Sequence, residues 1–279
     1  MNFVYDMVVF TNVKKESVEK LKGFTKEEPK TVYEEVRMKK NGATLILYTS
    51  GKLLVQGNED AVANVSEQLH KHGIGEATKR VVFKKETGTI IGSDESLKGD
   101  TFGGIVVAAV RADNMGREKL RELGVADSKK LRDTEIVMMA KKIRQISDCY
   151  VKSILPEEYN KFDGNVTKLL DKFHVECAHN LGSGTHVVDK YPGCTIGDVS
   201  VEKAESKYVE VAAASILARE SALRQINYLS KVAGFPIPKG STHVKLALHE
   251  LEERKLDPNK FVKTSFSNVK EFFKHKKVL

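Results

Sequence analysis

The chain has 279 residues, 41% of them hydrophobic, and its 46 basic and 38 acidic side chains give a formal charge of +8. This length allows one large domain or two unequal domains with a real core, and the basic balance is compatible with a polyanionic partner. The sequence has no run of about 18 apolar residues and no basic start followed by an apolar core, which argues against a membrane span and a signal peptide and predicts a cytoplasmic protein.

The cysteines give no sign of a disulfide framework or a zinc site. Cys149, Cys177 and Cys194 are odd in number and widely spaced, and none belongs to a Cys-x-x-Cys pattern. Disulfide-rich domains and zinc sites both need closer or paired spacings. We therefore expect reduced thiols with structural roles.

The first part of the chain predicts a small module of strands and helices. The expected elements are a strand over 2–10, a helix capped by Thr11 or Asn12 that runs to about Leu21, strands over 31–38, 44–48 and 53–55, and a helix over 59–71. Asn41-Gly42 is a strong signal for a hairpin turn between two of these strands. Residues 72–80 are polar, basic and aperiodic, which is typical of a linker, so a domain boundary is predicted near residue 80.

This front module lacks a catalytic signature. Its acidic residues lie in polar stretches, where solvation explains them. A sheet that exposes Lys39, Lys40, Thr49 and Lys52 is suited to a nucleic-acid backbone. On these residues alone, a purely structural appendage is almost as well supported.

Two adjacent carboxylates stand near the start of the larger region. Residues 89–93 are an apolar run that predicts a strand, Asp94-Glu95 follow it, and the turn 98–100 leads into a second predicted strand over 101–110. Carboxylates crowded at the end of a sheet are costly unless positive charge neutralises them, and a divalent cation is the simplest source of that charge. Together with the basic balance of the chain, this pattern favours a nucleic acid that is handled by metal ions.

Two later carboxylates repeat the pattern. Asp189 ends an apolar, β-branched run over 184–188, and ligands collect at the carboxyl ends of strands in open α/β sheets. Glu205 comes shortly before an alanine-rich segment over 209–219 that predicts a close-packed helix. Taken singly, each of these acids is explained about equally well as a helix cap or a turn residue. Together they predict a cluster that holds two metal ions.

Lysines become more frequent near the carboxyl end. They are Lys263, Lys270, Lys274, Lys276 and Lys277. This pattern is most typical of a solvated helix end.

Longer motifs resemble one family nearly from end to end. They are Ser50–Gly57, Gly92-Ser93-Asp94-Glu95 with Gly99-Asp100 and Phe102-Gly103, Asp127-Ser128-Lys129-Lys130-Leu131, Pro156, Tyr159-Asn160, Asn165, Val188-Asp189-Lys190, Lys203–Lys207, Ala212–Ile216 and Pro238-Lys239-Gly240. They are similar to the motifs of the ribonuclease HII and HIII family. The segment Ser50–Gly57 is similar to the front-domain signature of the HIII type, which the HII type lacks.

The resemblance implies an α/β (α+β) fold with a ribonuclease H-like core and a mixed five-stranded sheet. Residues 1–80 would form a small TATA-binding-protein-like domain that binds the substrate, and residues 81–279 would form the catalytic domain with a helical carboxyl-terminal segment. The implied protein is a monomer without membrane contacts.

The implied activity is endonucleolytic hydrolysis of the RNA strand of RNA/DNA hybrids, leaving 5′-phosphate and 3′-hydroxyl ends. Two divalent ions, Mg²⁺ or Mn²⁺, would activate a water molecule. The implied catalytic and metal-binding residues are Asp94, Glu95, Asp189 and Glu205. The implied substrate-binding residues are Lys98, Gly99, Ser128, Lys129, Lys203 and Lys52. We expect Tyr159 and Asn160 to pack or to order a loop.

The sequence departs from the family pattern at two positions after the acidic pair. Leu97 stands where the family has a glycine in the turn that reads the ribose 2′-hydroxyl, and leucine resists positive φ and blocks close backbone approach. Gly104 replaces a proline, and we expect it to loosen the next strand. An alternative function therefore stays open, namely a protein that binds hybrids or duplexes with weak or lost cleavage. A glycosidase is disfavoured by the basic charge and the absence of tryptophan.

Overall fold

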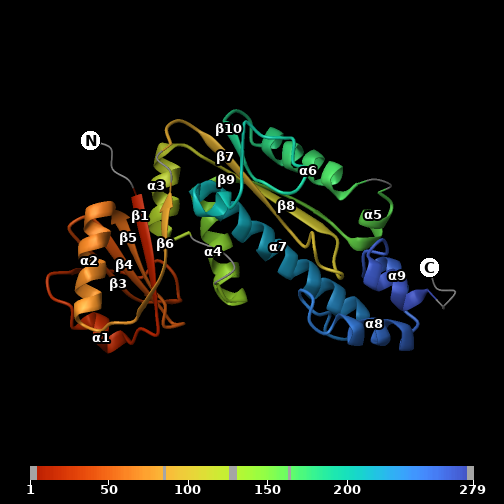
Figure 1. Ribbon diagram of the computed structural model, residues 1–279, viewed down its shortest axis with the longest axis horizontal. Coiled ribbons are helices and arrows are strands. Elements are labelled where there is room, and N and C mark those ends of the chain that lie inside the picture. The colour runs from red at the N-terminus through yellow and green to blue at the C-terminus, as the bar shows by residue number, and fades with distance from the viewer. Residues whose placement is uncertain (1–4, 84–85, 126–130, 163–164, 275–279) are drawn as a thin grey trace.

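The computed structural model describes residues 5–83, 86–125, 131–162 and 165–274 of the chain. Two sheets organise it, an antiparallel sheet of six strands near the amino end and a mixed sheet of five strands later in the sequence (Figure 1). The predicted α/β class and the predicted mixed five-stranded sheet are confirmed. Within these ranges, no helix is both long and apolar enough to cross a membrane.

The first sheet carries helices on one of its faces. Its strands, in spatial order and all antiparallel, are β2 (Thr25–Glu27), β3 (Glu34–Lys40), β4 (Ala43–Tyr48), β5 (Leu53–Asn58), β1 (Tyr5–Thr11) and β6 (Glu76–Phe83). Successive residues of a strand point to opposite faces, so Leu45 and Leu47 of β4 point to the same side. Helices α1 (Lys15–Glu19) and α2 (Glu59–Lys71) cover that side and complete a buried cluster with them (Figure 1).

Most elements predicted for this module are present, and two predictions differ from the structure. Asn41 and Gly42 both have positive φ, at 46° and 87°, and form the predicted hairpin turn between β3 and β4. The first predicted helix is limited to α1, which ends at Glu19 and not near Leu21, and its N-cap residue is Lys14, so the predicted cap by Thr11 or Asn12 is wrong. The predicted linker over 72–80 contains the start of β6, since Glu76 already pairs with β1. Its polar sequence gives no strand signal because the strand depends on backbone pairing with β1.

The second sheet combines antiparallel and parallel strand pairs. In spatial order its strands are β11 (Val199–Val201), β10 (Thr185–Asp189), β7 (Ile90–Ser96), β8 (Ile105–Ala112) and β9 (Asp148–Ile154). The strands β7, β8 and β9 are antiparallel neighbours, whereas β10 runs parallel to both β7 and β11. The carboxyl ends of β7 and β10 therefore meet at the same edge of the sheet.

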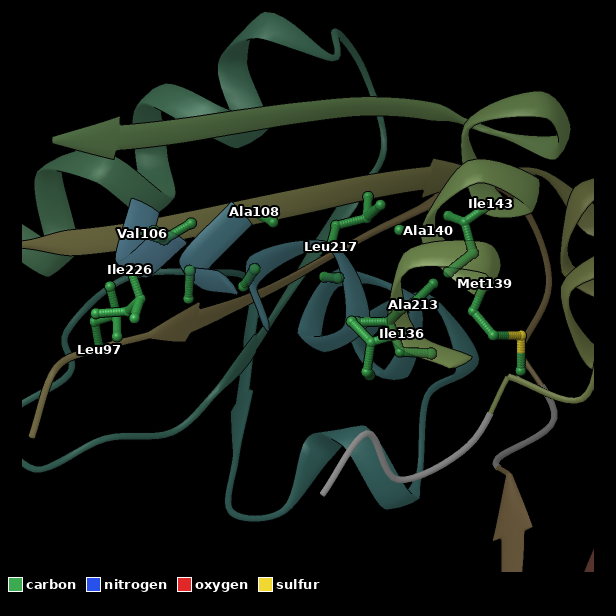
Figure 2. Close-up of a cluster of buried hydrophobic side chains, with 14 of the residues drawn as sticks. Leu97, Val106, Ala108, Ile136, Met139, Ala140, Ile143, Ala213, Leu217 and Ile226 are labelled. Carbon is green, nitrogen blue, oxygen red and sulfur yellow. The ribbon is translucent and has the colours of Figure 1, made fainter. Parts of the chain in front are cut away.

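Helices cover both faces of the second sheet. They are α3 (Asn114–Leu123), α4 (Asp133–Ile146) and α7 (Val209–Ala233) on one face and α6 (Val166–Asn180) on the other (Figure 1). Because β8 is buried on both sides, Val106 packs in the cluster of α7 and Val107 in the cluster of α6. Figure 2 shows part of the first cluster, including Ala213. A Cβ on Gly92 would lie 2.3 Å from the backbone nitrogen of Val211, so β7 and α7 approach too closely for any other residue there.

The second face of the first sheet packs against the end of α3. Tyr48 and Leu54 belong to the same buried cluster as the helices of the second sheet. Gly124, with φ 78°, ends α3 beneath them, and a Cβ there would lie 2.8 Å from the Tyr48 hydroxyl and from the Leu54 side chain. Arg37 of β3 also donates to the carbonyl of Glu122 at 2.5 Å. One face of each sheet therefore contributes to the same buried apolar cluster.

The carboxyl-terminal segment is helical, as predicted, and differs from the prediction at one lysine. Its elements are α8 (Val244–Glu253), the 3-10 helix η3 (Pro258–Lys260) and α9 (Ser267–Phe273). Lys270 and Lys274 are exposed, as expected of a solvated helix end. Lys263 has no exposed surface, so that expectation is wrong for this residue. Lys276 and Lys277 lie outside the described residues.

Candidate active site

Three elements bring the four predicted carboxylates to one place. Asp94 and Glu95 lie near the carboxyl end of β7. Asp189 is the last residue of β10, which pairs with β7 in parallel. Glu205 lies in the 3-10 helix η2 (Ala204–Ser206), shortly before α7. The charges of Glu95, Asp189 and Glu205 all act on Asp94. The structure therefore brings together acids that are far apart in the sequence.

Burial and mutual repulsion raise the pKa of two of these carboxyls. Burial, and then the charges of its acidic neighbours, raises the pKa of Asp94 well above its ordinary value, although the Glu95 N–H donates to Asp94 Oδ1 at 2.7 Å and acts in the opposite direction. Burial likewise raises the pKa of Asp189 to about 6, and Glu205 adds to this effect. The Ala204 N–H, which donates to Asp189 Oδ1 at 2.9 Å, opposes it. Added positive charge would relieve this repulsion.

Glu95 differs from its neighbours because basic groups lie beside it. Lys98 Nζ is 2.5 Å from Glu95 Oε1, and His174 Nε2 is 3.4 Å from Glu95 Oε2. Burial acts to raise the pKa of Glu95, but His174 and Lys98 together lower it. Glu95 therefore keeps its charge at pH values where Asp94 takes up a proton.

A serine hydroxyl joins two buried imidazoles behind Glu95. Ser93 Oγ lies 2.7 Å from Nδ1 of His174 and 2.8 Å from Nε2 of His186. A hydroxyl has one proton to donate, so it donates to one ring and accepts from the other. Because His174 Nε2 faces the Glu95 carboxylate, the proton of that ring belongs on Nε2. Ser93 then donates to His174, and His186 donates to Ser93, which fixes the orientation of the His174 ring.

The turn after the acidic pair forms with a leucine in the left-handed region. Leu97 has φ 66°, and its side chain is buried in the core near Ile226 (Figure 2). The expectation that Leu97 blocks backbone approach is therefore wrong, because the side chain points away from the open side of the turn. On that side, no atom of the described residues would lie within 4 Å of a Cβ on Gly99.

The second departure from the family pattern does not loosen the strand that follows. The N–H of Gly104 donates to Oε1 of Gln225 at 2.6 Å. A Cβ on Gly104 would lie 2.1 Å from the carbonyl oxygen of Ile154, so the packing here requires glycine. Proline has no N–H to donate, and the expectation of a loose strand start is wrong.

The predicted substrate-binding residues fall into three groups. Lys98 and Gly99 lie in the turn beside Glu95, and Lys203, which is exposed, directly precedes η2. Lys52 lies in the connection between β4 and β5 of the first sheet, whereas the acidic cluster lies on the second sheet and η2. Ser128 and Lys129 lie outside the described residues.

The chemistry of the cluster fits hard divalent cations. Its donors are carboxylate oxygens, which Mg²⁺ and Mn²⁺ prefer. Among the residues that the structure describes, the buried oxygen Glu205 Oε2 has no hydrogen-bond partner, so it is available as a ligand. Within the described ranges, no three His, Cys, Asp or Glu side chains already surround a single point as a finished metal site.

The histidines of this site are not identified by the sequence. His174 lies on the apolar face of α6, between residues of the buried cluster, where a histidine is most often a packed core residue. His186 lies inside the apolar run of β10. Of the three residues in this hydrogen-bonded chain, only Ser93 could be linked to the site from the sequence, because it directly precedes Asp94. Pairing with either histidine depends on the neighbouring positions of α6, β7 and β10.

Comparison with known proteins gives a consistent result. The family model described as Ribonuclease HII matches residues 91–269. Ribonuclease HIII of Protochlamydia amoebophila is 34% identical over 233 residues, which are 75% of this chain and 76% of that protein. Ribonuclease HIII of Bacillus cereus (strain AH187) is 33% identical over 282 residues, covering 88% of this chain and 91% of that protein.

Solved structures agree with the sequence relatives. The crystal structure of Bst-RNase HIII in complex with Mn²⁺ has a TM-score of 0.61 and 26% identity, and the match covers 97% of this chain and 99% of that one. The crystal structure of Aquifex aeolicus RNase H3 has a TM-score of 0.57 and 27% identity, with 93% of this chain and 100% of that one covered. The similarity extends over both sheets.

Proposed function

Since the chain belongs to the ribonuclease HII and HIII family, we propose that it hydrolyses the RNA strand of RNA/DNA hybrids with two divalent ions, Mg²⁺ or Mn²⁺. The chain is an endonuclease of the ribonuclease H type. The proposed products carry 5′-phosphate and 3′-hydroxyl ends, and the proposed active form is a monomer that needs no membrane.

One observation carries this proposal. Four carboxylates, Asp94, Glu95, Asp189 and Glu205, come from β7, β10 and η2 and act on one another electrostatically at a single edge of the sheet. A packed core does not need such a cluster, and it is costly without a cation. The Mn²⁺ in the similar Bst-RNase HIII structure supports a divalent ion as its partner.

The four acids are the proposed catalytic and metal-binding residues. When bound, two cations would activate a water molecule and stabilise the leaving oxygen of the phosphodiester. Asp94, on which the charges of the three other acids all act, would be one of the residues that hold the cations. His174 would hold Glu95 in position, because its Nε2–H faces the Glu95 Oε2 atom.

Basic groups around the acids are the proposed substrate contacts. Lys98 and Gly99 follow the acidic pair in the chain, and the exposed Lys203 directly precedes η2, which carries Glu205. We also assign phosphate contacts to Ser128 and Lys129 from the family resemblance. Lys52 would extend the contact to the front sheet, and a division of the chain near residue 80 into a binding and a catalytic part belongs to the same proposal.

The test is a cleavage assay with a hybrid whose RNA strand is labelled, in Mg²⁺ and in Mn²⁺. We expect internal cuts in the RNA strand, and we expect Asp94→Asn to lower the rate by about three orders of magnitude or more, because the variant loses one of the four proposed metal-binding carboxylates. Hybrid affinity should change by less than about threefold, since phosphate contacts elsewhere supply it. The matched control is Asp148→Asn, which changes an exposed acid at the start of β9 that is not part of the cluster.

The same assay separates the alternative function. Tight hybrid binding by the wild-type protein without internal cuts in either metal would identify a hybrid-binding protein. Wild-type turnover in Asp94→Asn would remove the acidic cluster from the mechanism.

A further inference from the structure

A fully buried lysine connects the carboxyl-terminal segment to the turn after the acidic pair. Lys263 has 0% exposed surface. Its Nζ donates to three backbone carbonyls, those of Leu97 at 2.8 Å, Asp100 at 2.5 Å and Gly103 at 2.9 Å. An ammonium group has three protons, so these bonds use its whole donor capacity.

Aromatic rings complete the surroundings of this ammonium group. Its nitrogen lies 5.4 Å from the ring centre of Tyr159 and 5.3 Å from that of Phe266. Rings at such distances attract a cation through their quadrupoles. Burial lowers the pKa of Lys263 to about 7, and the charge of Asp100 opposes this shift. The three carbonyl dipoles also favour the charged form.

Backbone pairing places Lys263 under the turn. Lys263 N–H donates to the Thr101 carbonyl at 3.0 Å, and Gly103 N–H donates to the Phe261 carbonyl at 3.1 Å. Phe102 and Val262 form an antiparallel bridge between these two bonds. The carboxyl-terminal segment is therefore paired with the end of the turn as a short ladder.

A side chain from another helix anchors the same segment. Asn160 Nδ2 donates to the Val262 carbonyl at 2.8 Å and to Asn259 Oδ1 at 2.8 Å, and Asn160 Oδ1 accepts from the Thr264 N–H at 3.1 Å. This confirms the expectation that Asn160 orders a loop. Lys263 is thus held on a fixed support from which it contacts the turn.

The turn has one face toward Lys263 and one face toward the acidic cluster. The carbonyls of Leu97 and Gly103 point inward to the ammonium group, whereas Lys98 extends to Glu95. In the part of the chain that the structure describes, the N–H groups of Lys98 and Gly99 have no acceptor. Among the described residues, no atom would lie within 4 Å of a Cβ on Gly99, so the turn is open at this residue.

We infer that Lys263 is a positioning residue for the hydrolysis reaction, which holds the turn 97–103 so that Lys98 and the free N–H groups of residues 98 and 99 meet the substrate beside Glu95. This inference rests on the proposed function. Methionine would fill the space but would leave three carbonyls without a donor.

The central test compares Lys263→Met with Lys260→Met, which changes an exposed lysine three residues away on η3. In Lys263→Met we expect kcat for hybrid cleavage to fall about 100-fold, because misplacement by about 1 Å has an effect of this size. The hybrid dissociation constant should change by less than about threefold, since distributed phosphate contacts set it. Lys260→Met should match the wild-type protein in both quantities.

Amide hydrogen exchange provides a readout that does not depend on activity. The peptide over 97–104 should exchange at least about tenfold faster in Lys263→Met, whereas α7 should keep its protection as a sign that the fold is intact. An intact variant with wild-type kcat or with unchanged exchange over 97–104 would overturn the inference.

A measurement on the wild-type protein covers the case in which Lys263→Met does not fold. Brief reductive methylation of the native protein, followed by peptide mass spectrometry, should modify Lys263 at least about tenfold more slowly than Lys260, because modification requires local opening. Equal rates would show that Lys263 does not hold the turn. If the wild-type protein does not cleave hybrid at all, the proposed function fails, and the exchange and methylation results still decide whether Lys263 fixes the turn.

Discussion

At residue 97 the chain uses leucine where the backbone has φ 66°. An L-residue in the left-handed region is strained by roughly 1–2 kcal/mol. Burial of the Leu97 side chain stabilises the fold by about 1.5–3 kcal/mol, which is enough to offset this strain. The three-carbonyl contact of Lys263 also holds the Leu97 carbonyl in place. A residue that conflicts with its local conformation is thus stabilised by contacts from distant parts of the chain.

This balance predicts an unusual order of stability among small residues at position 97. Leu97→Gly and Leu97→Ala should each lower the free energy of unfolding by about 2–4 kcal/mol, because both lose the buried side chain. Leu97→Ala should be the less stable of the two, since alanine keeps the strain and glycine does not. Urea unfolding of both variants measures the difference. Alanine more stable than glycine would show that the turn is not strained at this residue.

His186 makes stability depend on pH. Burial, and then the nearby His174, lowers the pKa of His186 from 6.5 to about 4 in the folded protein. As the pH falls, His186 therefore takes up a proton in the unfolded chain before it does so in the folded protein. The neutral His186 contributes its full stabilisation of the folded state above about pH 6.5, and this contribution is lost as the pH falls toward 4.

Replacement of His186 should remove this part of the pH dependence. When the pH is lowered from 7 to 4.5, the free energy of unfolding should decrease in both proteins. The decrease should be smaller in His186→Gln than in the wild-type protein, by on the order of 2 kcal/mol, because glutamine does not titrate. Denaturant unfolding at the two pH values measures the difference. His179→Gln, at an exposed site on α6, is the control and should keep the wild-type dependence. Equal pH dependence in His186→Gln and the wild-type protein would contradict the assignment.

At the scale of elements, one glutamine fastens α7 to two strands. Gln225 Oε1 accepts from the Gly104 N–H at 2.6 Å, and Gln225 Nε2 donates to the Ile154 carbonyl at 2.9 Å and to Ser153 Oγ at 3.1 Å. These bonds join the start of β8 and the end of β9 to the helix. They replace the rigidity that a proline at position 104 would supply.

The loss of this connection should destabilise the fold measurably. Gln225→Leu should lower the free energy of unfolding by about 2 kcal/mol, because it leaves a buried N–H and a buried carbonyl without partners. Asn227→Leu, at an exposed position of α7, should change stability by less than about 0.5 kcal/mol. Thermal and urea unfolding of both variants provide the comparison, and equal effects would remove Gln225 from this role.

At the scale of the whole molecule, Arg37 links the front sheet to the second sheet. It is 1% exposed, its Nη1 lies 3.3 Å from both carboxylate oxygens of buried Glu34, and its Nη2 donates to the Glu122 carbonyl at the end of α3. The packing of Tyr48 and Leu54 against Gly124 surrounds this contact. The relative position of the two sheets is therefore set by a packed, charged contact as well as by the connecting chain.

Removal of Arg37 should test this connection. Arg37→Met should lower the free energy of unfolding by about 3–5 kcal/mol, because it leaves the buried Glu34 carboxylate without its partner. The double variant Arg37→Met, Glu34→Gln should recover part of this loss, since glutamine carries no charge. Denaturant unfolding of the wild-type protein, the two single variants and the double variant gives the double-mutant cycle for this pair. No recovery in the double variant would assign the loss to packing alone.

The sequence by itself determined the elements that have a strong local pattern and the acids that follow them. The helix over 59–71 has the predicted bounds because its apolar period and its Asn58 cap are local features, and Asn41-Gly42 encodes its turn directly. Asp94 and Asp189 could be chosen because each follows an apolar run, and Glu205 because it precedes an alanine-rich predicted helix; the family motifs then supported all three.

Only the tertiary structure decided which side chains meet. The strand β6, the buried position of Lys263 and the chain from His186 through Ser93 to His174 all depend on contacts between residues far apart in the sequence. Hydrogen bonding and burial depend on neighbours in space, and a local pattern does not specify those neighbours. For the same reason, the sequence could identify Leu97 as unusual but could not show that its side chain turns into the core.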